Sequence, residues 1–205
     1  MENGEAETIA GRAPRQARGR ERREAIIDAA AEIVAEQGIE ALGIHSAARR
    51  AGASIGSMYH FFQNREELLE ALMQRHRLAL AAISEETGRI PEERWRAMTA
   101  DEVIANLFGR PLGYFDRRRD ALAMSSVQES AQAAEFQSLL QHVMIARLGS
   151  TAGRKAAVIL FAVSAGTLYF LRDTHFGEGD GPINEIVKVL TAYLTTIEGT
   201  IAEAG

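Results

Sequence analysis

The residues from Ala47 to Phe62 constrain this chain more than any other stretch, because they combine a sharp helix stop with a new helix start. Gly52 follows a short helical run, and a helix that stops sharply favours glycine just past its end. The hydroxyl of Ser54 is placed to cap the amides of a second helix. In that helix apolar residues recur at i, i+3, i+4 and i+7, which predicts one buried face made of Ile55, Met58, Tyr59 and Phe62.

The opposite face of this second helix carries small or hydrogen-bonding residues, namely Gly56, Ser57, His60 and Gln63. Asn64 with Glu67 three residues later has the pattern of a capping box, which predicts the start of another helix. Two short helices joined by a tight glycine-containing turn form a helix-turn-helix. In proteins that bind DNA through this motif, the second helix enters the major groove.

The run from Glu24 to Leu69 resembles the DNA-binding domain of the tetracycline-repressor (TetR) family of transcription regulators. The resemblance rests on Ile26 to Ala30 (Ile-x-x-Ala-Ala), Gly38, Ala48, Ala51-Gly52, Ser54, Gly56, Tyr59-His60-x-Phe62 and Glu66-Glu67-Leu68-Leu69. It covers about the first third of the chain in sequence, and the rest in length and helical pattern alone. It implies an all-α fold with a three-helix DNA-binding domain, a connector helix and a C-terminal helical domain for ligand binding and dimerisation.

The resemblance also implies which residues contact DNA, although three positions depart from the family pattern. Gly43 replaces the usual capping Ser or Thr, His45 a common arginine, and Phe61 an aromatic residue with a hydroxyl, and these departures concern the operator sequence rather than the activity. Ser57 and His45 are expected at base edges, and Arg65 at a phosphate. The full predicted set is Ile44, His45, Ser54, Ile55, Gly56, Ser57, Tyr59, His60 and Arg65.

Periodicity and helix-breaking residues predict how the chain is organised. Residues 1–19 lack a period and are predicted to form a disordered tail, residues 20–64 the DNA-binding domain and residues 65–86 the connector helix. The remainder, residues 87–205, is predicted to be entirely helical, because it has no alternating run typical of a strand. Its helices are expected near 91–108, 112–130, 132–148, 152–172 and 182–203.

The net charge of −5 is unevenly distributed along the chain. Residues 11–65 contain nine arginines and six acidic residues, so a basic N-terminal segment precedes an acidic remainder. Such a distribution suits local attraction to phosphates. Four tail arginines, Arg12, Arg15, Arg18 and Arg20, either reach a minor groove as an arm or are simply solvated, and the sequence leaves both open.

Composition argues against several other classes of protein. The chain has no cysteine, which excludes disulfides, thiolate nucleophiles and zinc–thiolate sites. The five histidines lack metal-binding spacing and no nucleophile–base pair is recognisable, so we expect no metal, no cofactor and no enzyme activity. We expect neither a membrane span nor a signal peptide, and therefore a cytoplasmic protein.

The C-terminal domain is rich in large apolar side chains, and in the family that the chain resembles this region encloses a small-molecule pocket. The predicted ligand contacts are Trp95, Met98, Phe115, Met124, Gln128, Phe136 and His142, with Gln128 and His142 as the polar groups. The same side chains can equally fill a core, and the sequence does not decide between the two.

The last two predicted helices carry apolar stripes at nearly heptad spacing, more than one core-facing side requires. Two such helices from each of two chains would form a four-helix bundle, so a homodimer is expected, with packing inside one chain as the alternative. The predicted interface residues are Phe161, Leu168, Ile186, Leu190, Tyr193 and Ile197.

Together these patterns predict a sequence-specific regulator that binds double-stranded DNA. The expected form is a homodimeric repressor on a palindromic operator, released by a small apolar effector. An alternative keeps the DNA binding but gives the C-terminal domain a protein partner instead of a ligand. An enzyme is the remote third possibility.

Overall fold

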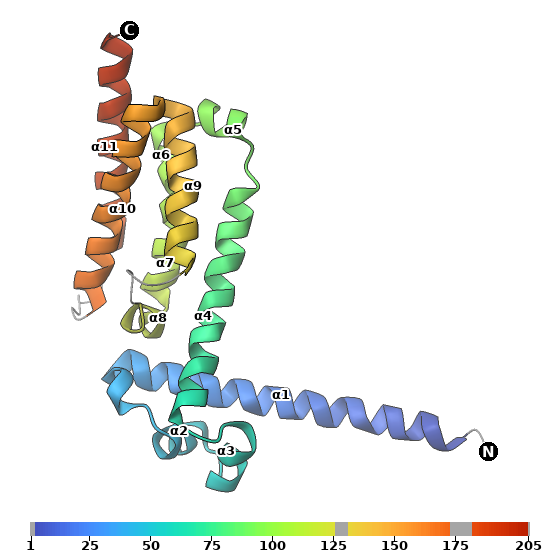
Figure 1. The fold of residues 1–205 in the computed structure, drawn as a ribbon. Helices are drawn as coiled ribbons and strands as arrows, with labels where there is room; N and C mark the ends of the chain where they lie inside the picture. Colours follow the sequence, from blue (N-terminus) through green and yellow to red (C-terminus); the bar gives the residue numbers. More distant parts are fainter. Residues whose placement is uncertain (1–2, 126–130, 173–181, 205) are drawn as a thin grey trace. The chain divides into compact units, whose positions relative to one another are not determined.

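The computed structural model describes residues 3–125, 131–172 and 182–204 (Figure 1). Every regular element within these ranges is a helix, which confirms the predicted all-α fold. The chain divides into two compact units, Met1–Arg75 and His76–Gly205. The division falls inside one continuous helix, α4 (Arg65–Gly88).

The first unit contains α1 (Asn3–Gln37), the 3-10 helix η1 (Ile39–Ala41), α2 (Ile44–Ala51), α3 (Ile55–Phe61) and the beginning of α4. Gly38, whose φ is 82°, provides the left-handed residue with which the chain turns after α1. The apolar side chains of these helices form one core, with Ile26, Ile27, Ala30, Ile33, Val34, Leu42, Met58, Phe62, Leu68 and Leu72 all buried.

The beginning of α1 differs from the prediction of a disordered tail through residue 19. The helix begins at Asn3 and continues without a break into the buried stripe that starts at Ile26. A helix that is already nucleated by core packing adds further turns at little cost, and Ala, Glu and Arg are good helix formers. Weak periodicity therefore did not mean the absence of a helix.

The second unit contains the rest of α4 and the remaining helices. These are α5 (Glu92–Ala97), α6 (Ala100–Ile104), the π-helical η2 (Ala105–Gly109), α7 (Arg110–Arg117), α8 (Arg119–Ala123), α9 (Ala131–Leu148), α10 (Ser150–Arg172) and α11 (Pro182–Ala204). Their core includes Trp95, Val103, Leu107, Phe108, Leu140, Val143, Met144, Leu160, Leu190 and Leu194.

The π-helical segment η2 joins α6 and α7 into one helical run with a widened middle. Pro111 lies two residues after its last residue, and proline has no N–H to donate to the carbonyl of residue 107. Its ring also clashes with that carbonyl in a regular α-helix, and a wider turn relieves the clash. The run therefore continues through Pro111, where the sequence predicted a break between two helices.

Helices α9 and α10 pack against each other with unusually close backbones. Gly149, with a φ of 78°, turns the chain between them. A Cβ placed on Gly153 of α10 would lie 2.6 Å from the Cα and N of Ile145 and from the carbonyl oxygen of Met144. Only glycine allows this approach, so the Gly149-x-x-x-Gly153 segment fixes how the two helices meet.

One described helix, α10, is long and apolar enough to cross a membrane by length and composition, which the sequence analysis did not expect. A core helix of a water-soluble protein passes the same test. A third of the apolar stretch of α10 is buried inside the chain. Ala156, Leu160 and Leu168 of this helix belong to the core of the second unit. Core packing accounts for part of its apolar character.

Candidate nucleic-acid interface

The helix-turn-helix has the local geometry that its sequence predicts. Gly52 adopts a left-handed conformation, with φ 60° and ψ 30°, and ends α2. The hydroxyl oxygen of Ser54 accepts a hydrogen bond of 3.2 Å from the backbone N–H of Ser57, which caps α3. Asn64 accepts a bond of 2.9 Å from the N–H of Glu67 at the start of α4. These caps fix the direction of α3 without using its exposed side chains.

Only half of the predicted buried face of α3 is buried. Met58 and Phe62 are inaccessible, whereas Ile55 is 37% and Tyr59 51% exposed. An apolar stripe spans about 100° of a helix surface, and the first unit covers only the side that holds Met58 and Phe62. Ile55 and Tyr59 therefore join Gly56 and His60 on the exposed surface of α3, while Ser57 is half-buried.

The start of α2 holds two further predicted DNA contacts in different environments. His45 is exposed, whereas the side chain of Ile44 is buried in the core of the first unit. Gly43 has no side chain that could cap α2. Instead, the hydroxyl oxygen of Ser46 accepts a 2.9 Å hydrogen bond from the backbone N–H of Gly43.

Arg65 has a structural task that the sequence did not reveal. Its Nε donates to the carbonyl of Leu42 at 2.8 Å, and an Nη donates to the carbonyl of Ile39 at 2.9 Å. The guanidinium therefore ties the start of α4 to η1 and to the chain before α2. A phosphate contact by Arg65 stays a prediction, and it would have to be made alongside these two bonds.

Some of the other arginines that the structure describes in the first unit form ion pairs with acidic side chains, and others do not. Arg50 donates to Glu36 at 2.7 Å and to Glu32 at 3.1 Å, and this contact holds α2 against α1. The hydrogen bond from Arg50 lowers the pKa of Glu36 below its ordinary value. Among the residues that the structure describes, no ion pair involves Arg22 or Arg49. Both side chains are exposed.

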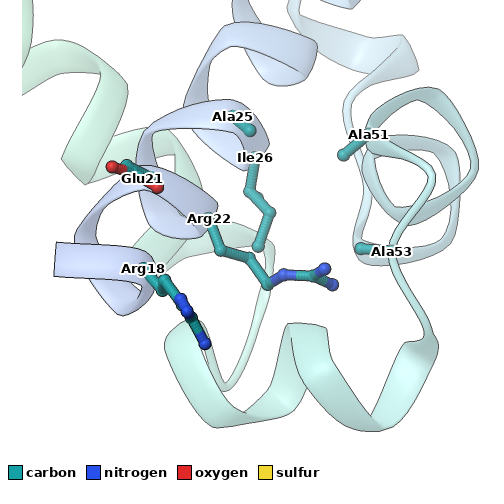
Figure 2. A pocket seen from close by; sticks show the side chains of 7 residues that line it. All are labelled: Arg18, Glu21, Arg22, Ala25, Ile26, Ala51 and Ala53. Atoms are coloured by element: carbon teal, nitrogen blue, oxygen red, sulfur yellow. The ribbon is translucent and has the colours of Figure 1, made fainter. Parts of the chain in front are cut away.

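A pocket of about 370 Å³ lies between α1 and the turn of the helix-turn-helix (Figure 2). It is lined by Arg18, Glu21, Arg22, Ala25, Ile26, Ala51 and Ala53. In Figure 2 the guanidinium of Arg22 extends across the pocket toward Ala53, whereas the carboxylate of Glu21 points away. Arg18 and Arg22 thus line a pocket beside the turn that leads into α3. Arg18 belongs to the segment that was predicted to be a disordered tail.

The predicted ligand contacts of the second unit are only partly brought together. Met98, Phe115 and Phe136 are half-buried and pack against a core cluster that includes the fully buried Trp95. Phe136 meets Phe108 edge-on, with ring centroids 5.4 Å apart, and Phe161 at 6.3 Å. These residues pack in the core of the second unit, and a contact with a ligand stays a prediction.

The predicted polar groups do not complete that cluster. The side chain of His142 is 62% exposed and lies 3.5 Å from Glu92, so it faces solvent rather than a cavity in the core. Met124 is half-buried at the end of α8. Gln128 lies outside the described residues. Among the described residues, no group of three His, Asp or Glu side chains could hold a metal ion.

The predicted dimer residues all contact the core of their own chain, and their place in an interface between chains stays a prediction. Leu168 and Leu190 are buried within the second unit, and Phe161, Ile186, Tyr193 and Ile197 pack against the same core. Burial raises the pKa of Tyr193. Heptad spacing identified an apolar face but could not tell packing within a chain from packing between chains. The exposed apolar residues of α10 and α11 are others: Val158, Ile159, Tyr169, Phe170, Val189 and Ile201.

Comparison with known proteins agrees with the helix-turn-helix geometry. Residues 26–72 match the family model described as bacterial regulatory proteins of the tetR family. The chain is 29% identical over 142 residues to the HTH-type transcriptional regulator BetI of Escherichia coli O127:H6. That alignment covers 65% of this chain and 63% of the relative, so it spans less than two thirds of the relative's length.

Two solved structures share the fold over most of this chain at low sequence identity. A TetR-like transcriptional regulator from Rhodococcus sp. RHA1 is 16% identical, with a TM-score of 0.61 over 83% of this chain and 92% of that one. The regulator FadR from Bacillus subtilis, solved in complex with stearoyl-CoA, is 19% identical. Its TM-score is 0.55 over 82% of this chain and 97% of that one.

Proposed function

The chain is a member of the tetR family of bacterial regulatory proteins, and from this premise we propose that it represses transcription as a homodimer on a palindromic operator. The observation that carries the proposal is the exposed surface of α3, held in place by the left-handed Gly52 and the Ser54 cap. We further propose a cytoplasmic location and a role in binding rather than catalysis.

The DNA contacts that we propose come from α2, α3 and the pocket beside them. Ser57 and His60 would meet base edges or phosphates, and His45 would add a contact from the start of α2. The exposed Tyr59 supports a contact of its hydroxyl with a phosphate. Arg18 and Arg22 add positive charge next to α3, which supports phosphate binding where Arg65 is already committed to two backbone carbonyls.

The proposed dimer uses the exposed faces of α10 and α11 in place of the predicted set. Val158, Ala162, Gly166 and Phe170 are exposed and spaced four residues apart, so they form one row along α10. Phe170 is 75% exposed, and Tyr169 beside it 57%. The large apolar side chains Val158, Tyr169 and Phe170 are exposed to solvent, and such side chains favour burial against another helix surface. A second copy of the chain would supply that surface in a two-fold arrangement.

The effector that we propose is a small, mainly apolar molecule bound in the second unit. The aromatic cluster of Trp95, Phe108, Phe136 and Phe161 supports an apolar ligand. The stearoyl-CoA bound by the structural relative FadR shows that this fold accommodates a long acyl chain in that protein. Release from DNA requires that the effector bind more tightly to one particular conformation of the dimer. In that conformation the two DNA-binding domains are wrongly spaced for the operator.

Selection of bound duplexes from a random DNA pool tests this proposal most economically. We expect an enriched near-palindrome with two half-sites about one helical turn apart, because a two-fold protein binds a two-fold site. A control selection uses the variant Tyr59→Ala with His60→Ala, whose side chains are exposed and not part of the core. Enrichment of the same sequence by both proteins would assign DNA binding to another surface, and no enrichment at all would refute the proposed function.

A further inference from the structure

Helix α4 passes from the first unit to the second between two consecutive residues whose polar side chains have different partners. Arg75, the last residue of the first unit, donates to Asp28 at 2.6 Å and to Glu24 at 2.9 Å on α1. His76, the first residue of the second unit, contacts Tyr114 of α7 and Asp120 of α8. One helix is thus bound by polar contacts within each unit at adjacent positions.

The contacts of His76 belong to a buried polar network in a unit that is otherwise packed by apolar residues. The His76 Nδ1 atom lies 2.7 Å from the Tyr114 hydroxyl, and Nε2 lies 3.0 Å from a carboxylate oxygen of Asp120. The second contact lacks the geometry of a hydrogen bond, so it is a close contact between the imidazole and the carboxylate. Arg118 grips Asp120 with two parallel bonds of 3.1 and 2.9 Å.

Burial makes this network costly to break. The side chains of His76 and Asp120 are 7% and 4% exposed, so neither can exchange its partner for water without opening the structure. Burial alone would raise the pKa of Asp120, but the contacts with His76 and Arg118 outweigh it and hold that pKa below its ordinary value. The Tyr114 hydroxyl can donate to a neutral imidazole or accept from a protonated one, so the network survives either charge state of His76.

We propose that the His76–Tyr114–Asp120–Arg118 network is a latch that fixes α4 against α7 and α8 in the second unit, and that opening it reduces the DNA-competent state of the dimer. The regulatory half of this proposal rests on the proposed function. A shift of α7 or α8 around a bound effector would have to carry α4 with it or break the latch. Because α4 is continuous into the first unit, either event reaches the DNA-binding domain.

A second contact between the same helices provides the matched control. Glu86 of α4 pairs with Arg110 of α7, as His76 pairs with residues of α7 and α8, but the side chains of Glu86 and Arg110 are 55% and 51% exposed. Exposed ion pairs contribute little to holding two helices together, whereas removing one partner of a buried pair is strongly disruptive. Glu86→Gln and Asp120→Asn therefore each remove one carboxylate from a contact between α4 and the α7–α8 segment, and only the second is expected to loosen α4.

Hydrogen–deuterium exchange of the full-length protein tests the latch without DNA. In Asp120→Asn, amide exchange in residues 76–88 should rise about tenfold over wild type, and in Glu86→Gln it should stay within about twofold. Equal exchange in the two variants would overturn the proposal. Should Asp120→Asn raise exchange throughout the second unit, Tyr114→Phe decides, because it removes one hydroxyl; its increase should be smaller and confined to residues 76–88.

Binding to the selected operator tests the regulatory half. Asp120→Asn should bind the full palindrome about fivefold or more weakly than wild type, but it should bind a single half-site equally well. The two results differ because the latch acts on the spacing of the two DNA-binding domains in the dimer. A purely structural role would weaken both or neither, and that result would overturn the regulatory half. If the wild-type protein selects no DNA, the proposed function fails, while the exchange experiment still decides whether the network holds α4.

Discussion

Replacing Arg147 by methionine should destabilise the second unit far more than replacing any surface arginine. The side chain of Arg147 is only 7% exposed and reaches from α9 to two other helices. It donates to the carbonyl oxygens of Trp95 and, at 2.8 Å, of Met98 at the end of α5, and to the carboxylate of Glu198 on α11. Methionine preserves much of the side-chain volume and removes all of these bonds.

The magnitude follows from what the substitution leaves behind. Each buried carbonyl that loses its donor costs about 1 kcal/mol or more, because water cannot fully replace the guanidinium. Glu198 is left without its partner but is 29% exposed, so partial hydration lowers the cost of an uncompensated charge. The expected loss in the free energy of unfolding is about 3 kcal/mol, at the lower end of the range for breaking a buried ion pair.

Urea denaturation followed by fluorescence measures this loss directly. Trp95 is the only tryptophan and its own carbonyl is one of the lost acceptors, so its emission reports on the affected region. Arg89→Met is the control: Arg89 pairs with Glu85 at 2.5 Å, but the two side chains are 72% and 66% exposed, so no measurable change is expected. If Arg147→Met were as harmless as Arg89→Met, the structural role of this clamp would be refuted.

Three further predictions follow from single residues. Gly153→Ala should lower the midpoint of thermal unfolding although alanine favours helix by about 1 kcal/mol, because the new Cβ meets the backbone of Ile145 at 2.6 Å; a higher midpoint would contradict the close packing. If the proposed dimer forms through α10, Phe170→Glu should convert it to a folded monomer in sedimentation, since the side chain is exposed within one chain; an intact dimer would place the interface elsewhere. Because the folded-state pKa of Asp120 is lowered, its ionised form contributes stability above the ordinary pKa of about 3.9 that is lost as the pH falls below it. The stability difference between wild type and Asp120→Asn should therefore shrink in urea titrations below about pH 4, and a constant difference would contradict the assigned shift.

Local patterns predicted the helix-turn-helix because its determinants are neighbours in sequence. Gly52 ends one helix, Ser54 caps the next, and Asn64 caps α4, and each acts on residues within about one helical turn. The same periodicity placed Met58 and Phe62 in the core. It could not show that the core stops short of Ile55 and Tyr59, because that limit depends on which helices cover α3.

Long-range contacts were beyond the reach of sequence patterns. Arg65 was predicted to bind phosphate, and nothing nearby in sequence indicated the carbonyls of Leu42 and Ile39 that it contacts. The network around His76 joins this residue to Tyr114 and Asp120, which lie 38 or more positions along the chain from it. In α10 and α11 the heptad pattern identified residues such as Leu190 that are buried within the chain, and it did not indicate the exposed row that contains Phe170.

The central claim, that the exposed surface of α3 reads DNA sequence, is tested most directly by one ratio. This ratio compares the affinity for the selected operator with the affinity for a scrambled duplex of equal length. We predict that Ser57→Ala with His60→Ala lowers the ratio about tenfold or more, because each lost base contact removes about 1–3 kcal/mol of discrimination. Arg154→Ala, an exposed substitution on α10, should leave it unchanged. An unchanged ratio in the α3 variant would contradict the account.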